Sequence, residues 1–302
     1  MRRKADPAPM ADPASTPPPD FDEFRHLIKE RYATLPRRLT QLADFVMSSP
    51  DDFALGTVSS VASHAGVQPS TVIRFARLFG FAGFSDMQDV FRARLRGRPH
   101  TYRDRIDALR QADGRLPSVM TLLDGFSDAF EASLRTMRLH MEGDRLERAV
   151  EILSSSETVY LLGMRRSAAV VEYFSYLLGK LGVKNIVVGS ATNMETEIVS
   201  FATGRDAAFI ISNTPYAPRT IDLFAQFEAQ GTRLVVLTDS PFSAVVPADG
   251  VWFELIEADF KGFRANSAGM VLIMTLAAAI GERRQYPADS QKSDRSRTRT
   301  TA

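Results

Sequence analysis

Hydroxyl and guanidinium side chains recur at helical spacing between residues 70 and 77. At about 100° per residue, Ser70, Arg74 and Arg77 fall on one face of a helix. The opposite face is apolar and consists of Val72, Phe75 and Phe79. Guanidinium groups bind guanine edges and phosphates, and hydroxyl groups donate to phosphate oxygens. The pattern indicates a helix that is packed down by aromatic side chains and presents DNA-binding groups.

The residues just before this helix complete a helix-turn-helix pattern. A first helix is expected from Val58 to about His64, with Thr57 or Ser59 as its cap. Gly66 permits a tight turn, and Pro69 suits the start of the second helix. The second helix of such a motif enters the major groove with its N-terminal half. Six polar residues are predicted to contact DNA: Thr57, Gln68, Ser70, Thr71, Arg74 and Arg77.

A plain helical hairpin with two solvated arginines is the alternative interpretation of this stretch. The net charge of the whole chain is only +1, so DNA affinity would have to come from a local patch. Residues 69–98 contain such a patch, with six arginines against two aspartates. Its arginines beyond the motif lie on or just after a further predicted helix, which runs from Phe84 to Arg96: Arg92, Arg94, Arg96 and Arg98.

Length and composition set the broad class. At 302 residues the chain is longer than one hydrophobic core usually grows, so two domains are expected. There are no cysteines, which excludes disulfides and thiolate metal sites. The longest apolar run, residues 268–280, is shorter than a membrane span requires. A cytoplasmic protein with no membrane contact, cofactor or metal site is predicted.

The second half of the chain alternates short apolar runs with helical stretches. Crossovers of 12 or more residues separate these runs, as in a parallel sheet covered on both faces. The runs lie at residues 159–162, 186–188, 207–211, 234–237 and 251–255. A doubly wound α/β domain is therefore predicted, in which ligands bind beyond the carboxyl ends of the strands.

Hydroxyl-rich loops follow the first, third and fourth of these runs. They span residues 163–167, 212–220 and 238–241, and the first two also carry arginine. Ser167 is placed to cap the helix that starts at Ala168. Helix N-termini with hydroxyl and guanidinium groups favour an anion such as phosphate or carboxylate. The alternative is that these serines and threonines only cap helices and form no ligand site.

The two halves together resemble the RpiR/MurR family of bacterial transcription regulators, which join a helix-turn-helix domain to a sugar isomerase (SIS) domain. The matching stretches are residues 58–81 with Ala-Gly-Val and Ser-Thr-Val-Ile-Arg-Phe, then 160–163 with Ser167, and 234–240. The resemblance covers about residues 20–284. It implies a homodimer or homotetramer on a palindromic operator of double-stranded DNA. It also implies a phosphosugar, or a related anionic metabolite, that alters DNA affinity.

Two departures from the family pattern affect the ligand loops. Pro215 stands where the family has a glycine after the third strand, and Arg165 stands where its first loop often has a second glycine. Proline removes one backbone donor, so arginine side chains would have to supply the missing charge. The resulting candidate ligand residues are Gly163, Arg165, Arg166, Ser167, Ser212, Thr214, Arg219 and Thr220.

The expected organisation is an all-α helix-turn-helix domain followed by a five-stranded parallel, flavodoxin-like SIS domain. The segments are a disordered arm at 1–19, the DNA-binding domain at 20–97, a linker at 98–117, the SIS domain at 118–285 and a basic tail at 286–302.

A ligand-responsive regulator with no catalytic residues is the favoured function, and a sugar-phosphate isomerase with a helical appendage is the alternative. The isomerase would need a base for proton transfer. Its candidate bases are Glu172, Glu195, Glu197 and Glu257. A third possibility, an oligomer scaffold, comes from the apolar stretch Met270–Ile280.

Overall fold

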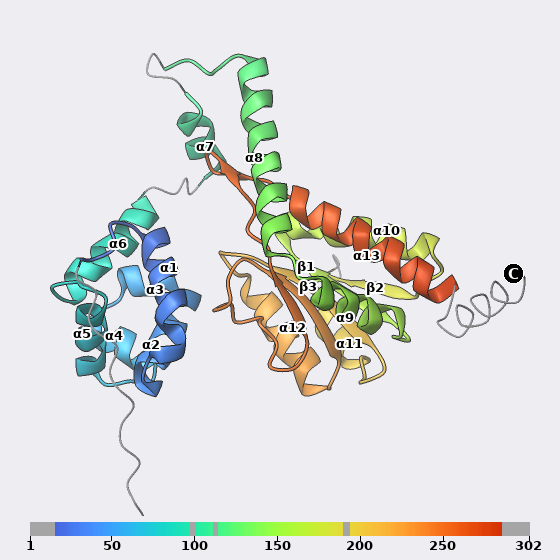
Figure 1. Ribbon diagram of the computed structural model, residues 1–302, viewed down its shortest axis with the longest axis horizontal. Helices are drawn as coiled ribbons and strands as arrows, with labels where there is room; N and C mark the ends of the chain where they lie inside the picture. Colours follow the sequence, from blue (N-terminus) through green and yellow to red (C-terminus); the bar gives the residue numbers. More distant parts are fainter. Residues whose placement is uncertain (1–15, 97–100, 111–113, 190–193, 286–302) are drawn as a thin grey trace, which may run out of the picture. The chain divides into compact units, whose positions relative to one another are not determined.

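The computed structural model describes residues 16–96, 101–110, 114–189 and 194–285 (Figure 1). The chain divides into two compact units, residues 1–108 and 109–302. Most of the predicted arm and all of the predicted basic tail lie outside the described residues. The predicted linker, residues 98–117, contains a short helix, α7 (Tyr102–Ala108).

The first unit is helical throughout its described residues. The predicted helix-turn-helix is confirmed, with α4 and α5 joined by a short turn. Its helices are α1 (Phe21–Arg31), α2 (Arg37–Ser48), α3 (Pro50–Leu55), α4 (Val58–His64), α5 (Pro69–Leu78) and α6 (Phe84–Arg96), with a 3-10 turn at Tyr32–Thr34.

A cluster of aromatic rings holds this unit together. The Phe24 ring lies edge-on to the rings of Phe75, Phe79 and Phe91, with centroids 5.3 to 6.5 Å apart. All four rings are fully buried. Buried aromatic side chains contribute both apolar area and specific edge-to-face contacts. The apolar face of α5 is therefore fixed to α1 and α6, which leaves its other face for solvent.

Glycine sets the turn between α4 and α5. Gly66 has φ of 62°, a value that L side chains rarely adopt. The Val67 N–H donates to the carbonyl of Ala62 at 2.9 Å, and the Gly66 N–H donates to the carbonyl of Ser63 at 3.1 Å. These two bonds form a Schellman motif, which satisfies the last carbonyls of α4. The turn is therefore specified by one residue.

Arg94, one of the four arginines predicted to extend the basic patch beyond α5, is not exposed to solvent. The Arg94 side chain is 7% exposed, pairs with Asp51 and lies 4.7 Å from the centre of the Phe21 ring. Arg92 donates to the Ala54 carbonyl at 3.1 Å. The prediction for Arg94 is wrong, because its guanidinium joins helices α3 and α6 within the unit. Arg98 lies outside the described residues.

The second unit is built on a five-stranded, all-parallel sheet, as predicted. The strand order is β2-β1-β3-β4-β5. The strands are β1 (Val159–Gly163), β2 (Asn185–Val188), β3 (Ala207–Ser212), β4 (Arg233–Thr238) and β5 (Val251–Glu254). The order reverses between β1 and β3, because the chain moves from β1 to one side and then back to the other.

Helices cover both faces of this sheet (Figure 1). Side chains alternate along β1: Leu161 joins a core with α9, α10 and α13, whereas Leu162 joins a core with α11 and α12. The helices of this unit are α8 (Val119–His140), α9 (Gly143–Ser154), α10 (Ala168–Lys180), α11 (Glu195–Ser200), α12 (Pro218–Ala229) and α13 (Ser267–Gln285). No helix in the described ranges has the length and apolar character needed to cross a membrane.

A small antiparallel hairpin follows β5 and was not predicted. It consists of β6 (Asp259–Phe260) and β7 (Phe263–Arg264). Its two turn residues, Lys261 and Gly262, have φ of 53° and 89°. Two-residue turns with positive φ match the twist of a hairpin. The hairpin packs on α8, one of the longest helices of the unit.

Candidate functional site

The helix α5 presents its polar face to solvent. Gln68, Ser70, Arg74 and Arg77 are exposed and Thr71 is half-buried, so five of the six predicted DNA contacts lie at or on this helix. Ile73 is 39% exposed beside them. Apolar side chains contact the thymine methyl group in the major groove. Sequence reasoning missed Ile73, because an isoleucine in a helix is usually assigned to the core.

Thr57, the sixth predicted contact, has a structural role. Its side-chain oxygen accepts from the Ser60 N–H at 3.1 Å, and the Thr57 N–H donates to the Ser60 hydroxyl at 2.8 Å. This is a capping box at the start of α4. Gln68, in contrast, makes no capping bond at the start of α5. The first helix of the motif is therefore fixed more firmly at its N-terminus than the second.

A pocket opens in the second unit beyond the carboxyl ends of β1 and β3. This is the point where the strand order reverses, where ligands of such folds bind. The enclosed space is about 50 Å³. Its lining comes from the loops after the two strands and the start of α12: Met164, Arg165, Arg166, Ser167, Ile211, Ser212, Asn213, Thr214, Pro215, Ala217 and Thr220.

Six of the eight predicted ligand residues line this pocket, and Gly163 and Arg219 do not. A Cβ on Gly163 would come within 2.9 Å of the Ser167 carbonyl oxygen, so glycine lets the loop close onto α10. The Arg219 guanidinium instead lies 3.4 Å from the Glu195 carboxylate and donates to the Thr196 hydroxyl at 2.7 Å. It joins α12 to α11.

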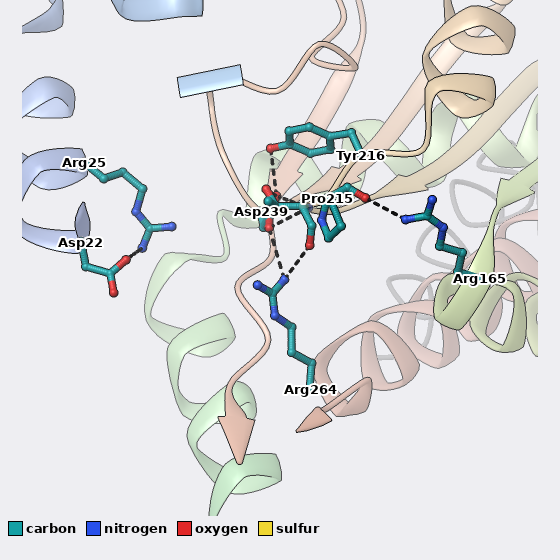
Figure 2. Close-up of polar contacts among 8 residues, drawn as sticks. Asp22, Arg25, Arg165, Pro215, Tyr216, Asp239 and Arg264 are labelled. Carbon is teal, nitrogen blue, oxygen red and sulfur yellow. Dashed lines mark hydrogen bonds and ion pairs between the residues drawn. The ribbon is translucent and has the colours of Figure 1, made fainter. Parts of the chain in front are cut away.

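The loop after β1 carries a strained arginine. Arg165 has φ of 57° and is one of two non-glycine residues with positive φ in the described part of the chain. Its guanidinium donates to the Pro215 carbonyl across the pocket mouth at 3.4 Å (Figure 2). A strained backbone of this kind is typical of functional sites.

Ser167 lines the pocket but does not cap α10. It is the last residue of a 3-10 turn (Arg165–Ser167) and has helical backbone angles, and its side chain makes no capping bond. The capping prediction is wrong, because an N-cap residue needs extended angles to aim its oxygen at the helix amides. The Ser167 side chain is buried in the pocket wall instead.

A carboxylate that the sequence did not single out fixes the loop after β3. Asp239, just beyond β4, accepts from the Thr214 N–H at 3.0 Å and from the Tyr216 hydroxyl at 3.0 Å (Figure 2). The Arg264 guanidinium lies 3.7 Å from the same carboxylate and donates to the Thr214 carbonyl at 2.9 Å. The Thr214–Pro215 peptide bond is cis. Thr214 is therefore held on both its N–H and carbonyl sides.

The ionisation of Tyr216 reflects this environment. Burial first, and then the negative charge of Asp239, raises the pKa of Tyr216 to about 12 from its ordinary value of 10.0. The hydroxyl therefore keeps its proton and remains a donor to Asp239 throughout the neutral range.

Metal binding finds no support in the described ranges. They contain no group of three or more histidine, aspartate and glutamate side chains placed to hold a metal ion. The pocket lining also contains no carboxylate or imidazole among the residues that the structure describes.

These two sites define a helix-turn-helix protein with a C-terminal SIS domain, and comparison with known families agrees. The helix-turn-helix domain model of the rpiR family matches residues 23–96, and the SIS domain model matches residues 152–279. The chain belongs to the RpiR family of helix-turn-helix transcriptional regulators.

Two similar proteins are named as HTH-type transcriptional regulators. An uncharacterized HTH-type transcriptional regulator of Haemophilus influenzae is 24% identical over 215 residues, which is 71% of this chain and 73% of that protein. The regulator YbbH of Bacillus subtilis is 25% identical over 217 residues, 70% and 72% of the two chains. The Vibrio vulnificus NanR protein complexed with ManNAc-6P has a similar fold, with a TM-score of 0.52 and 18% identity, covering 91% of this chain and 98% of that one.

Tyr216→Phe tests the hydrogen bond that the Tyr216 hydroxyl donates to Asp239. The pKa of Tyr216 is raised from 10.0 to about 12 in the folded state. The protonated hydroxyl therefore makes its full contribution to the unfolding free energy below pH 10, and this contribution is lost as the pH rises toward 12. The difference in unfolding free energy between parent and variant should therefore be constant up to about pH 10 and then shrink. Urea denaturation at a series of pH values measures it. A difference that stays constant or grows between about pH 10 and 12 would contradict this assignment.

Proposed function

We propose that the pocket beyond β1 and β3 binds a small anionic sugar derivative, most simply a sugar phosphate, and that the bound ligand changes operator affinity. The supporting observation is the pocket lining, which combines two arginines with the hydroxyls of Ser167, Ser212 and Thr220 and lacks acidic groups in its described part. Cationic and hydroxyl donors that converge on one pocket favour an anion.

The lining also suits the sugar part of such a ligand. The side-chain oxygen of Asn213 is buried and accepts no hydrogen bond within the described structure. A sugar hydroxyl would satisfy it, because buried amide oxygens need a donor. The enclosed space is small for a whole sugar phosphate, so the anionic group would fill it while the rest of the molecule lies at its mouth. The similar NanR protein is complexed with ManNAc-6P, a sugar phosphate, which supports this ligand class.

Arg165 replaces a backbone donor in this proposal. Pro215 has no N–H, so the loop after β3 offers one donor fewer to an anion. Arg165 faces that loop from the other side of the pocket mouth. A guanidinium offers several donors in a fixed plane, which compensates for one missing amide. Retaining arginine at a positive φ, where glycine would be unstrained, is consistent with such a role.

Binding without turnover is the favoured mode, so the protein is proposed to act as a regulator and not as an isomerase. Among the candidate bases, Glu195 is buried and paired with Arg219, and Glu257 accepts from the Gly269 N–H at 2.9 Å. Glu172 and Glu197 are exposed. All four lie outside the pocket lining.

Arg165→Gly should separate ligand binding from folding. Glycine relieves the positive φ but adds backbone entropy, so the unfolding free energy should stay within about 1 kcal/mol of the parent. The loss of the guanidinium should weaken binding of anionic sugars about tenfold or more. A thermal-shift screen of sugar phosphates, sugar acids and neutral polyols with the full chain measures this. Arg205→Gly, which removes an exposed arginine paired with Glu157, is the control. Preferential binding of a neutral polyol, or equal binding by Arg165→Gly, would contradict an anion site.

The exposed face of α5 is proposed to interact with DNA. Arg74 and Arg77 would contact base edges and phosphates, while Gln68, Ser70 and Thr71 would contact the backbone or the first bases. Thr57 would contribute only through its position at the start of α4. Operators for symmetric regulators are palindromic, so a palindromic site is expected. A regulator of this kind works in the cytoplasm, where the DNA is.

Arg74→Ala tests the placement of this helix. Loss of one base contact should reduce discrimination between the promoter region and unrelated DNA by about 1 to 3 kcal/mol. Fluorescence anisotropy at several salt concentrations separates this effect from loss of a phosphate contact, which changes the salt slope instead. Arg205→Ala, the same charge change in the second unit, is the control. If Arg74→Ala retains both its discrimination and its salt slope, α5 is not the reading helix.

A homodimer or homotetramer is proposed to form through α10 and α13. These helices pack side by side and expose Tyr173, Tyr176, Val271 and Met274. Helix α13 is apolar on its inner and outer faces, which is typical of a helix buried on both sides. A second copy would supply the outer cover through a symmetric contact.

Met274→Glu should break this contact, because a charge in an apolar interface lacks a partner. The mass from light scattering should fall to that of the monomer, whereas Gln285→Glu near the end of the same helix should leave it unchanged. A parent protein that is monomeric at all concentrations, or a Met274→Glu variant with the parental mass, would refute the proposed interface.

A further inference from the structure

We propose that residues 258–267, here called the bridging segment, couple the ligand pocket to helix α8. The segment contains the hairpin β6–β7 and ends at the start of α13. It contacts both loops of the pocket and also contacts α8 at several points. This inference rests on the proposed function, because the coupling has a regulatory use only if the pocket holds an effector.

On the pocket side, two side chains of the segment hold the two pocket loops. Arg264 donates to the carbonyl of Thr214 at 2.9 Å and pairs with Asp239 at 3.7 Å (Figure 2). The Asn266 amide donates to the carbonyl of Arg166 at 3.1 Å. Thr214 and Arg166 both line the pocket, one from each loop. A ligand that shifts either loop must therefore displace, or be resisted by, the bridging segment.

On the α8 side, the hairpin packs its aromatic residues against one turn of the helix. The ring of Phe126 lies edge-on to the rings of Phe260 and Phe263, with centroids 5.2 and 5.7 Å apart. A Cβ on Gly125 would overlap the Phe260 ring. The close approach of ring and helix backbone requires glycine at that position.

Hydrogen bonds add two further attachments to α8. The Ala258 N–H donates to the Ser133 hydroxyl at 2.8 Å, and the Ser267 hydroxyl donates to the Phe130 carbonyl at 3.2 Å. The fully buried Ser133 hydroxyl also donates to the Ala129 carbonyl at 2.9 Å, so it links the backbone of α8 to the Ala258 N–H. Both ends of the bridging segment are therefore attached to the helix.

The segment is stiff between its two sets of contacts. Its strands pair Phe260 with Phe263, and Gly262 donates to the Asp259 carboxylate at 2.7 Å. The Ala265 N–H also donates to the Ala258 carbonyl at 3.0 Å, which closes the segment below the hairpin. A short, closed hairpin transmits a displacement because packed elements do not deform continuously.

A displacement of the bridging segment would move helix α8 readily, because few residues of this helix are buried. Only Ala129 and Ser133 are buried among its 22 residues. Its position therefore depends on few buried contacts, which are made with α13 and with the bridging segment. In the sequence, α8 is the first helix after the DNA-binding unit and its linker, so a change in α8 acts on the connection between the units.

Hydrogen exchange of the full chain tests the coupling without any ligand. Arg264→Gln removes the pocket contact but leaves the hairpin and its aromatic residues intact. Exchange should become about fivefold faster in residues 212–216 and also in residues 119–133 of α8. The control is Arg284→Gln, which makes the same substitution at an arginine that donates to the carbonyls of Ser154 and Ser156, away from the pocket lining. The control should leave both stretches unchanged.

Coupling is reciprocal, so a change in α8 must reach the pocket. Phe126→Leu loosens the aromatic contact and should speed exchange in residues 212–216, which it does not touch. Arg264→Lys, which keeps the positive charge, replaces Arg264→Gln if that variant fails to fold.

Two results would overturn the proposal. Faster exchange confined to residues 212–216 in the Arg264 variant would make the segment a local brace, and unchanged exchange in both stretches would show that Arg264 positions neither. The proposed function fails separately, in the thermal-shift screen, where a pocket that binds no anion would leave the exchange results intact.

Discussion

The position of the pocket follows from one constraint of parallel sheets. All five strands end at the same edge, and the order reverses between β1 and β3. The loops after these two strands therefore diverge toward opposite faces of the sheet and leave a gap that side chains must fill or a ligand must occupy. The polar side chains of both loops line this gap, and Asp239, Arg264 and Asn266 hold the loops in place. The site is a consequence of topology, and its specificity comes from the loop residues.

Under the proposed function, the charge of Arg165 compensates within that gap for the backbone donor that Pro215 lacks. Pro215 removes an amide from one loop, and Arg165 occupies a positive φ in the facing loop. Backbone strain of this kind costs about 1 kcal/mol or more. Asp239 then orders the proline-containing loop from behind, through Thr214 and Tyr216. The negative charge of Asp239 would repel an anion in the proposed site, but the Arg264 guanidinium beside it offsets that charge.

The sequence was sufficient for the elements whose patterns are local. Continuous apolar runs predicted all five strands, and the opposed faces of residues 70–79 predicted α5. The sequence did not predict the features that depend on tertiary contacts. The two-residue strands of β6–β7 are too short for a periodicity, and the contact between Asp239 and Arg264 joins distant positions that only the fold brings together. Counting arginines also misled, because Arg94 is buried against Phe21 and Asp51. The residues that line the pocket, in contrast, follow directly from the strand ends.

The energies involved decide how large a structural response the protein needs. A coupling of about 1 to 3 kcal/mol changes an affinity by about 5- to 150-fold, which is enough to regulate binding to an operator. One charge-assisted hydrogen bond contributes about as much. Arg264 holds the Thr214 carbonyl by a bond of this kind, so rearranging it when an anion enters would supply free energy on that scale, and the neutral Asn266 bond to the Arg166 carbonyl would add about 0.5 to 1.5 kcal/mol. A helix as sparsely buried as α8 needs no more than this to change its position or its order. A short bridging segment is therefore sufficient to couple the pocket loops to α8, and the sheet itself can remain rigid.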